Sequence, residues 1–167
     1  MPVKNPKEVF VLMLSALRQG TERASNVFRE LSQVVQDPDV KEALEARVWL
    51  SEKILATQDE AFKLIGDKPS KISDRIHDVF VEDFRRELAE IQSPEAKRLY
   101  VLIQWNQLVH LRVGTYMALV AAADVTGHYG VGVLLESCLA DELAMVERTR
   151  RIIRRIAETR LAAARTA

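Results

Sequence analysis

The chain has 167 residues, with 24 lysines and arginines against 24 aspartates and glutamates, three histidines and one cysteine. This length suits one domain covering residues 1–167, and the zero net charge excludes a global field that would draw the protein to nucleic acid or to an anionic membrane. No apolar run approaches the roughly 20 residues of a membrane span. Met1 to Lys7 lacks the order of a signal peptide, and Cys138 has no second cysteine to pair with, so we expect a cytoplasmic protein.

The first two helices share one start signal. Asn5-Pro6 and Asp37-Pro38 each place a capping side chain before a proline at the first helical position. The first helix carries an apolar stripe in steps of three and four residues as far as Val35, and the second runs to about Ile65, where Gly66 stops it.

Three residues of these helices allow either a structural or a functional interpretation. Thr21 occupies a step of the first stripe, and we expect a core hydroxyl with a hydrogen-bond partner. Arg47 lies at the edge of the second stripe, where an arginine usually packs its stem on the core and keeps its charged end in water. Trp49 is expected on an outer flank, where an indole would suggest a subunit contact.

The second half of the chain repeats the pattern. A polar segment leads to a shorter helix, from about Ser73 to Ile91, which we place in a crossover connection. Ser93 starts a long helix that runs to Thr126, and the last helix begins near Val131. Four long helices, one short helix and no strand-like alternation predict an all-α fold, a ferritin-like four-helix bundle with a short extra helix in the crossover.

Potential ligand residues gather in the last two helices. His110 and Tyr116 lie on the predicted apolar stripe of the helix from Ser93 to Thr126, and Asp141 and Glu142 interrupt the inner arc of the last helix. The histidine and carboxylates could hold one zinc or iron ion loosely, or serve as an acid–base pair. We favour a buried histidine–carboxylate hydrogen bond that fixes the helix register, with Tyr116 packed in the core and its hydroxyl satisfied.

A run of residues in the second half of the chain begins at His110 and continues through Tyr116-Met117-Ala118-Leu119, Ala122, Gly127, Leu134-Leu135, Leu139 and Asp141-Glu142. This run resembles the second half of the ferritin-like YciE/YciF family of bacterial stress-associated proteins. Lys7-Glu8-Val9-Phe10 and Leu14-Ser15 are similar to the opening helix of that family. The resemblance implies a ferritin-like fold and covers most of the chain.

The departures from the family pattern concern its metal ligands. Aligned by eye, the ligand positions of the first two helices fall on Thr21 and near Leu50 and Ile54, and those around the later histidine fall on Val109 and Arg112. Apolar residues in these places would remove the anionic charge that attracts a cation, so no cofactor is expected. A shift of one residue would restore Glu22 as a ligand.

The last helix also carries a basic surface, made of Arg148, Arg150, Arg151, Arg154 and Arg155. Its apolar residues occupy the opposite arc, so we interpret these arginines as a solvated face, without the aromatic residues that stack on nucleic-acid bases. Three hypotheses remain. They are a non-catalytic structural or stress-associated protein, expected as a homodimer; a reduced metal or oxidoreductase site at His110, Asp141 and Glu142; and a helical adaptor that uses the basic face.

Overall fold

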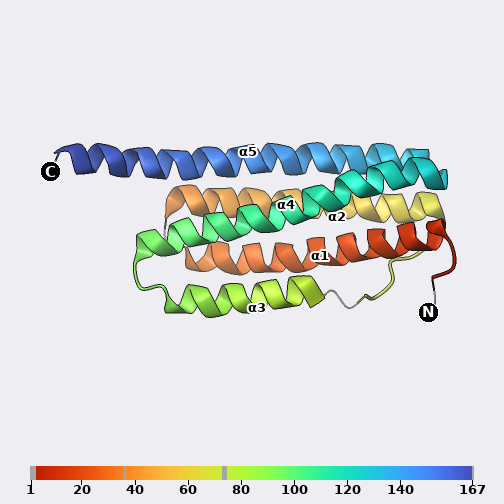
Figure 1. Cartoon of the computed structure of the whole chain (residues 1–167), viewed down its shortest axis with the longest axis horizontal. Coiled ribbons are helices and arrows are strands. Elements are labelled where there is room, and N and C mark those ends of the chain that lie inside the picture. Colours follow the sequence, from red (N-terminus) through yellow and green to blue (C-terminus); the bar gives the residue numbers. More distant parts are fainter. Residues whose placement is uncertain (1–2, 36, 73–74, 167) are drawn as a thin grey trace.

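The computed structural model describes residues 3–35, 37–72 and 75–166, in which five helices follow one another (Figure 1). They are α1 (Pro6–Val34), α2 (Pro38–Ile65), α3 (Arg75–Glu90), α4 (Pro94–Thr126) and α5 (Tyr129–Thr166). These described residues contain no strand, so the all-α prediction is confirmed.

The helix ends follow the chemistry of their terminal residues. Asn5, Asp37 and Ser93 each accept a hydrogen bond from the backbone N–H three residues further on, at 3.0, 3.1 and 3.3 Å. Gly66 and Gly127 end α2 and α4 with φ of 74° and 76°, a left-handed conformation that only glycine adopts without strain. These predicted starts and stops are confirmed.

Two boundaries differ from the predicted ones. The predicted start of α3 at Ser73 lies outside the described residues, and the helix ends at Glu90, one residue before Ile91. Helix α5 begins at Tyr129, two residues before Val131, because the carbonyl of His128 already accepts the backbone N–H of Val131 at 2.9 Å.

The four long helices lie side by side, with α2 and α4 running in one direction and α1 and α5 in the other (Figure 1). Helices α2 and α4 each pack against both α1 and α5. The shorter α3 lies along one half of α1, to which it is tied by the ion pairs Arg23–Asp78 and Arg85–Glu30. It buries Phe84 against the seam between α1 and α4 and leaves the other half of that seam uncovered.

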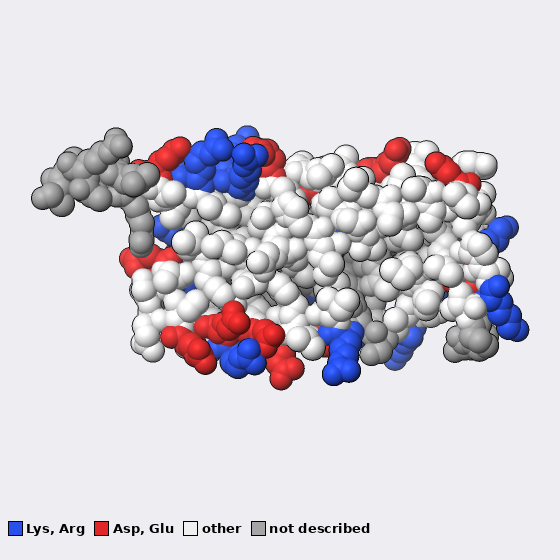
Figure 2. All heavy atoms as spheres, in the orientation of Figure 1, with Lys and Arg blue, Asp and Glu red and all other residues white. Residues whose placement is uncertain are grey.

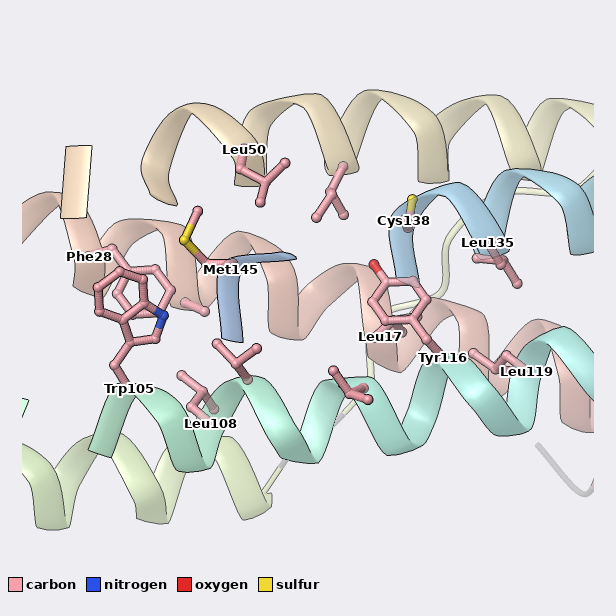
Figure 3. Packing of buried hydrophobic residues seen from close by; sticks show 14 of the residues in the cluster. Leu17, Phe28, Leu50, Trp105, Leu108, Tyr116, Leu119, Leu135, Cys138 and Met145 are labelled. Atoms are coloured by element: carbon pink, nitrogen blue, oxygen red, sulfur yellow. The ribbon is translucent and has the colours of Figure 1, made fainter. Parts of the chain in front are cut away.

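Apolar side chains from all four long helices fill the interior (Figure 3). Phe28 of α1 packs on Trp105 of α4 with ring centroids 5.6 Å apart. The apolar stripe predicted for α1 is buried through its length, apart from Val35, which is half-buried.

The buried face of α4 differs from the predicted face. Tyr116 is buried as expected, but His110 is exposed. Positions that the prediction left out take the places in the core: Val101, Trp105, Leu108, Arg112 and Leu119. The helix is therefore rotated about its axis relative to the prediction.

Helix α4 is also the one helix, within the described residues, that is long and apolar enough to cross a membrane by length and composition. Of its most apolar 18-residue window, 39% is buried inside the molecule. The core helix of a water-soluble protein passes the same test, so the composition of α4 by itself is weak evidence for a membrane span.

Candidate functional site

A group of charged side chains lies in the middle of the helical core. Arg47 of α2 and Glu142 of α5 are fully buried, and Arg112 of α4 is 2% exposed. Arg47 donates two hydrogen bonds to Glu142, from Nη1 to Oε2 at 2.7 Å and from Nη2 to Oε1 at 2.9 Å. Arg112 Nη2 lies 2.8 Å from the same Oε1. We call these three residues the Arg–Glu–Arg triad; both oxygens of its single carboxylate are bound by guanidinium groups.

Neutral side chains extend the triad across the core. Arg112 Nη2 donates to Thr21 Oγ1 of α1 at 2.9 Å, and that hydroxyl donates to the Leu17 carbonyl at 2.9 Å. Gln58 of α2 donates to the Tyr116 hydroxyl at 2.8 Å and to Thr21 Oγ1 at 3.3 Å. Each of the four long helices thus contributes, and the predictions of a satisfied core hydroxyl at Thr21 and of a core tyrosine are confirmed. Figure 3 shows Tyr116 reaching from α4 across the core.

The triad holds two positive charges and one negative charge away from water. Burial has the largest influence on Glu142 and by itself would raise its pKa, but Arg112 and Arg47 together outweigh it and hold the pKa below the ordinary value. Burial lowers the pKa of Arg47, yet a guanidinium in a protein stays protonated. The guanidinium carbon of Arg47 lies 5.5 Å from the centroid of the Phe28 ring, whose face attracts a cation.

The unpaired polar atoms of this network are mostly donors. Arg47 Nε, Arg112 Nε and Arg112 Nη1 are buried without a hydrogen-bond partner among the described residues, and so is the acceptor Gln58 Oε1. A site with three spare cationic donors and a net positive charge suits a neutral or anionic acceptor and repels a cation.

These residues do not fit the metal centre that the resemblance to ferritin-like proteins implies. Such centres need several carboxylates and histidines that point inward from the middle of the helices. Glu142 is the one buried carboxylate of the described residues, and both its oxygens already bind cations. Within the same residues, no three His, Cys, Asp or Glu side chains lie close enough to share an ion.

The three candidate residues His110, Asp141 and Glu142 do not come together. His110 is exposed, and its Nδ1 lies 2.8 Å from the Asn106 carbonyl of its own helix. Asp141 is half-buried and accepts a hydrogen bond from Lys53 Nζ at 2.7 Å. The predicted histidine–carboxylate hydrogen bond is therefore wrong, because α4 is rotated so that Arg112 takes the place next to Glu142.

The sequence prediction missed both arginines of the triad. Arg47 was expected to keep its charged end in water, and this is wrong, since its side chain is fully buried. Two signals could have identified them. Arg47 and Gln58 continue the spacing of three and four residues set by the buried Leu44, Ser51 and Ile54 of α2. Arg112 is the one charged residue between Leu99 and Ala123.

The basic surface of α5 is a mainly solvated face, as predicted, and it is partly neutralised within the chain. Arg148 Nη2 lies 2.9 Å from Glu42 of α2, and Arg155 Nη2 lies 2.8 Å from Asp39. Cys138 is buried, and burial raises the pKa of its thiol to about 11.

The fold and the buried network define an all-helical protein whose core holds an ionic cluster instead of a purely apolar centre. The chain belongs to the family described as "Domain of unknown function (DUF892)", whose model matches residues 5–162. This agrees with the resemblance to YciE/YciF proteins. None of the curated proteins matches the sequence.

Several solved structures are similar to this chain, and three of them are described here. The Escherichia coli stress protein YciF has a TM-score of 0.87 at 15% identity, with 93% of this chain and 99% of that chain covered. YcfI of Rhodopseudomonas palustris, a candidate structural protein, has a TM-score of 0.85 at 17% identity over 89% and 94%. A protein from Xanthomonas campestris has a TM-score of 0.71 at 17% identity over 96% and 99%. At these identities the similarity establishes the fold.

Proposed function

We propose that this protein is a non-catalytic, metal-free member of its family with a structural or stress-associated role. Its fold, in this proposal, is a ferritin-like four-helix bundle of α1, α2, α4 and α5, with α3 in the crossover. The similar structures include a stress protein and a candidate structural protein, which supports the role. The observation that carries the proposal is the Arg–Glu–Arg triad in the centre of the core.

Electrostatics favours the metal-free state. A divalent cation at Glu142 would have to displace guanidinium groups that make hydrogen bonds of 2.7 to 2.9 Å. It would then lie beside Arg47 and Arg112 in a medium that screens charge far less than water does. In this proposal the arginines supply the positive charge that metal ions supply in a carboxylate-rich centre, so the four helices can pack without one.

Metal analysis of the purified protein tests the proposal. The chain is produced in cells supplied with iron and zinc, and its metal content is measured by elemental analysis, together with its thermal unfolding in the presence of added Fe²⁺, Zn²⁺ or Mn²⁺. We expect substoichiometric metal and no rise in the unfolding temperature, because only a ligand that binds the native state stabilises it.

The variant His110→Ala distinguishes the metal-free protein from a protein with a reduced metal site. Stoichiometric, tightly held metal in the wild-type chain would contradict the proposal. If that metal were lost in His110→Ala, the alternative of a reduced site at His110, Asp141 and Glu142 would replace it. Consumption of peroxide by the wild type, abolished in the same variant, would lead to the same conclusion.

A further inference from the structure

The Arg–Glu–Arg triad has more hydrogen-bond donors than acceptors. Arg47 Nε, Arg112 Nε and Arg112 Nη1 are buried and donate to no described residue. Both oxygens of Glu142 already accept from Arg47, and one of them lies 2.8 Å from Arg112. A buried N–H group without an acceptor is destabilising, and more so when it belongs to a charged group. The triad therefore lacks an acceptor.

The charges of the triad show the same deficit. Its two cations and one anion are at most 2% exposed, and Glu142 is the one buried carboxylate of the described residues. Figure 2 shows the charged side chains of one face of the molecule along its edges, where basic and acidic groups lie close to one another. Surface arginines thus have carboxylates nearby, whereas the core holds one positive charge in excess. A single monovalent anion would balance it, and a divalent anion would reverse its sign.

Two buried hydroxyl groups adjoin the triad. Ser51 lies one helical turn after Arg47 on α2, and Ser25 lies one turn after Thr21 on α1, so each shares the inward face of its helix. Neither hydroxyl has a hydrogen-bond partner among the described residues. A hydroxyl can donate to an anion. A serine side chain is also short, so it leaves more room beside a guanidinium group than an apolar core residue would.

We propose that the triad binds one small monovalent anion, of the size of chloride, through the unpaired N–H groups of Arg47 and Arg112. An anion only accepts hydrogen bonds. A water molecule would bring two donors of its own to a network whose one unpaired acceptor is Gln58 Oε1. The anion also cancels the excess positive charge, and the attraction between unlike charges is much stronger in the core than in water.

This proposal rests on the metal-free core proposed above, because a metal cation at Glu142 would displace the guanidinium groups that bind the anion. Thermal unfolding of the full chain in sodium chloride, compared with sodium gluconate at the same concentration, tests it. At about 100 times its dissociation constant, chloride raises the unfolding temperature by about 5–10 °C over gluconate. Gluconate screens the surface ion pairs equally but is far larger than chloride.

Two variants change the charge of the triad in opposite directions. Arg112→Met leaves one cation and one anion, so we expect the chloride-dependent rise to disappear. Glu142→Gln leaves two cations and no anion, so we expect a larger rise than in the wild type. Arg151→Met is the matched control, because it removes an exposed arginine from the basic surface and leaves the triad intact. Its rise equals that of the wild type.

Bromide substitutes for chloride and scatters X-rays anomalously, so it locates the ion even if a variant does not fold. Crystals of the wild type grown in sodium bromide show an anomalous peak within hydrogen-bond distance of Arg47 or Arg112. Equal unfolding temperatures in chloride and gluconate, a rise that persists in a folded Arg112→Met, or bromide on the surface only would each overturn the anion site. The metal-free function would survive these results, whereas stoichiometric metal in the wild type would overturn both proposals.

Discussion

Glu142 is the residue on which the charged core depends. It is the single anion between two buried guanidinium groups, and its two oxygens accept three close contacts from them. Measurements on other proteins show that a buried ion cluster adds little stability over apolar residues of the same size, whereas removing one partner is strongly destabilising. The triad is therefore best understood as an arrangement that must be complete, and this makes its single carboxylate the most sensitive position.

Replacing this carboxylate by an amide leaves two buried cations without an anion. We expect Glu142→Gln to lower the free energy of unfolding by about 3–5 kcal/mol. Asp141→Asn is the control, because the adjacent Asp141 pairs with Lys53 at a position that water reaches, where an ion pair contributes about 1 kcal/mol or less. Urea unfolding of both variants measures the difference. Equal losses in the two variants would show that Glu142 does not neutralise the buried arginines.

At the scale of the helices, sequence reasoning succeeds where a local rule decides and fails where only the fold decides. The capping side chains at Asn5, Asp37 and Ser93 and the glycine stop signals depend on neighbours a few residues away, so the helix ends could be predicted. The buried face of α4 could not, because apolar residues surround nearly the whole helix, so hydropathy marks no outer side. Arg112, the one charged residue of that stretch, points inward. The sequence prediction instead puts His110 in the core and so misses the triad.

Asp37 joins two helices as well as capping one. Its side chain accepts the Val40 N–H at 3.1 Å and forms an ion pair with Arg98 of α4. We expect Asp37→Ala to cost about 1–2 kcal/mol of stability, the upper part of the range for the loss of a cap, because the ion pair is lost with it. Asp37→Asn keeps the capping oxygen and costs less than half as much, as measured by urea unfolding. A loss in Asp37→Asn as large as that in Asp37→Ala would assign the effect to the ion pair alone.

The charges of the whole molecule balance, whereas the buried triad carries two positive charges and one negative charge. Its 24 basic and 24 acidic residues give a net charge of zero at pH 7, so general self-repulsion is small there. The number and lengths of the helices, and the short helix between α2 and α4, were enough to predict an all-α fold. The charged core arises only when residues far apart in the chain meet, and periodicity within one helix does not contain that information.

We expect acid to destabilise the protein because its buried carboxylate, Glu142, is ionised in the folded state. The pKa of Glu142 is lower in the folded state than in the unfolded chain, where a glutamate has a pKa of about 4.3. Above that pH both states are ionised and the stabilisation by Glu142 is fully present. As the pH falls below it, the unfolded chain takes up a proton that the folded protein does not, so stability decreases until the folded carboxyl group is protonated as well.

Urea unfolding at a series of pH values from about 7 down to about 2.5 checks this for the wild type and Glu142→Gln, since acid-induced loss of stability falls in that range. We expect the wild type to be the more stable protein at neutral pH and its advantage to shrink steadily below about pH 4.3, because the variant has no group to titrate at this position. Asp37, whose pKa is also lowered because Arg98 and the Val40 N–H outweigh its burial, is present in both proteins and cancels from the difference. Two stability curves that stay parallel across this range would show that the buried arginines do not hold Glu142 ionised.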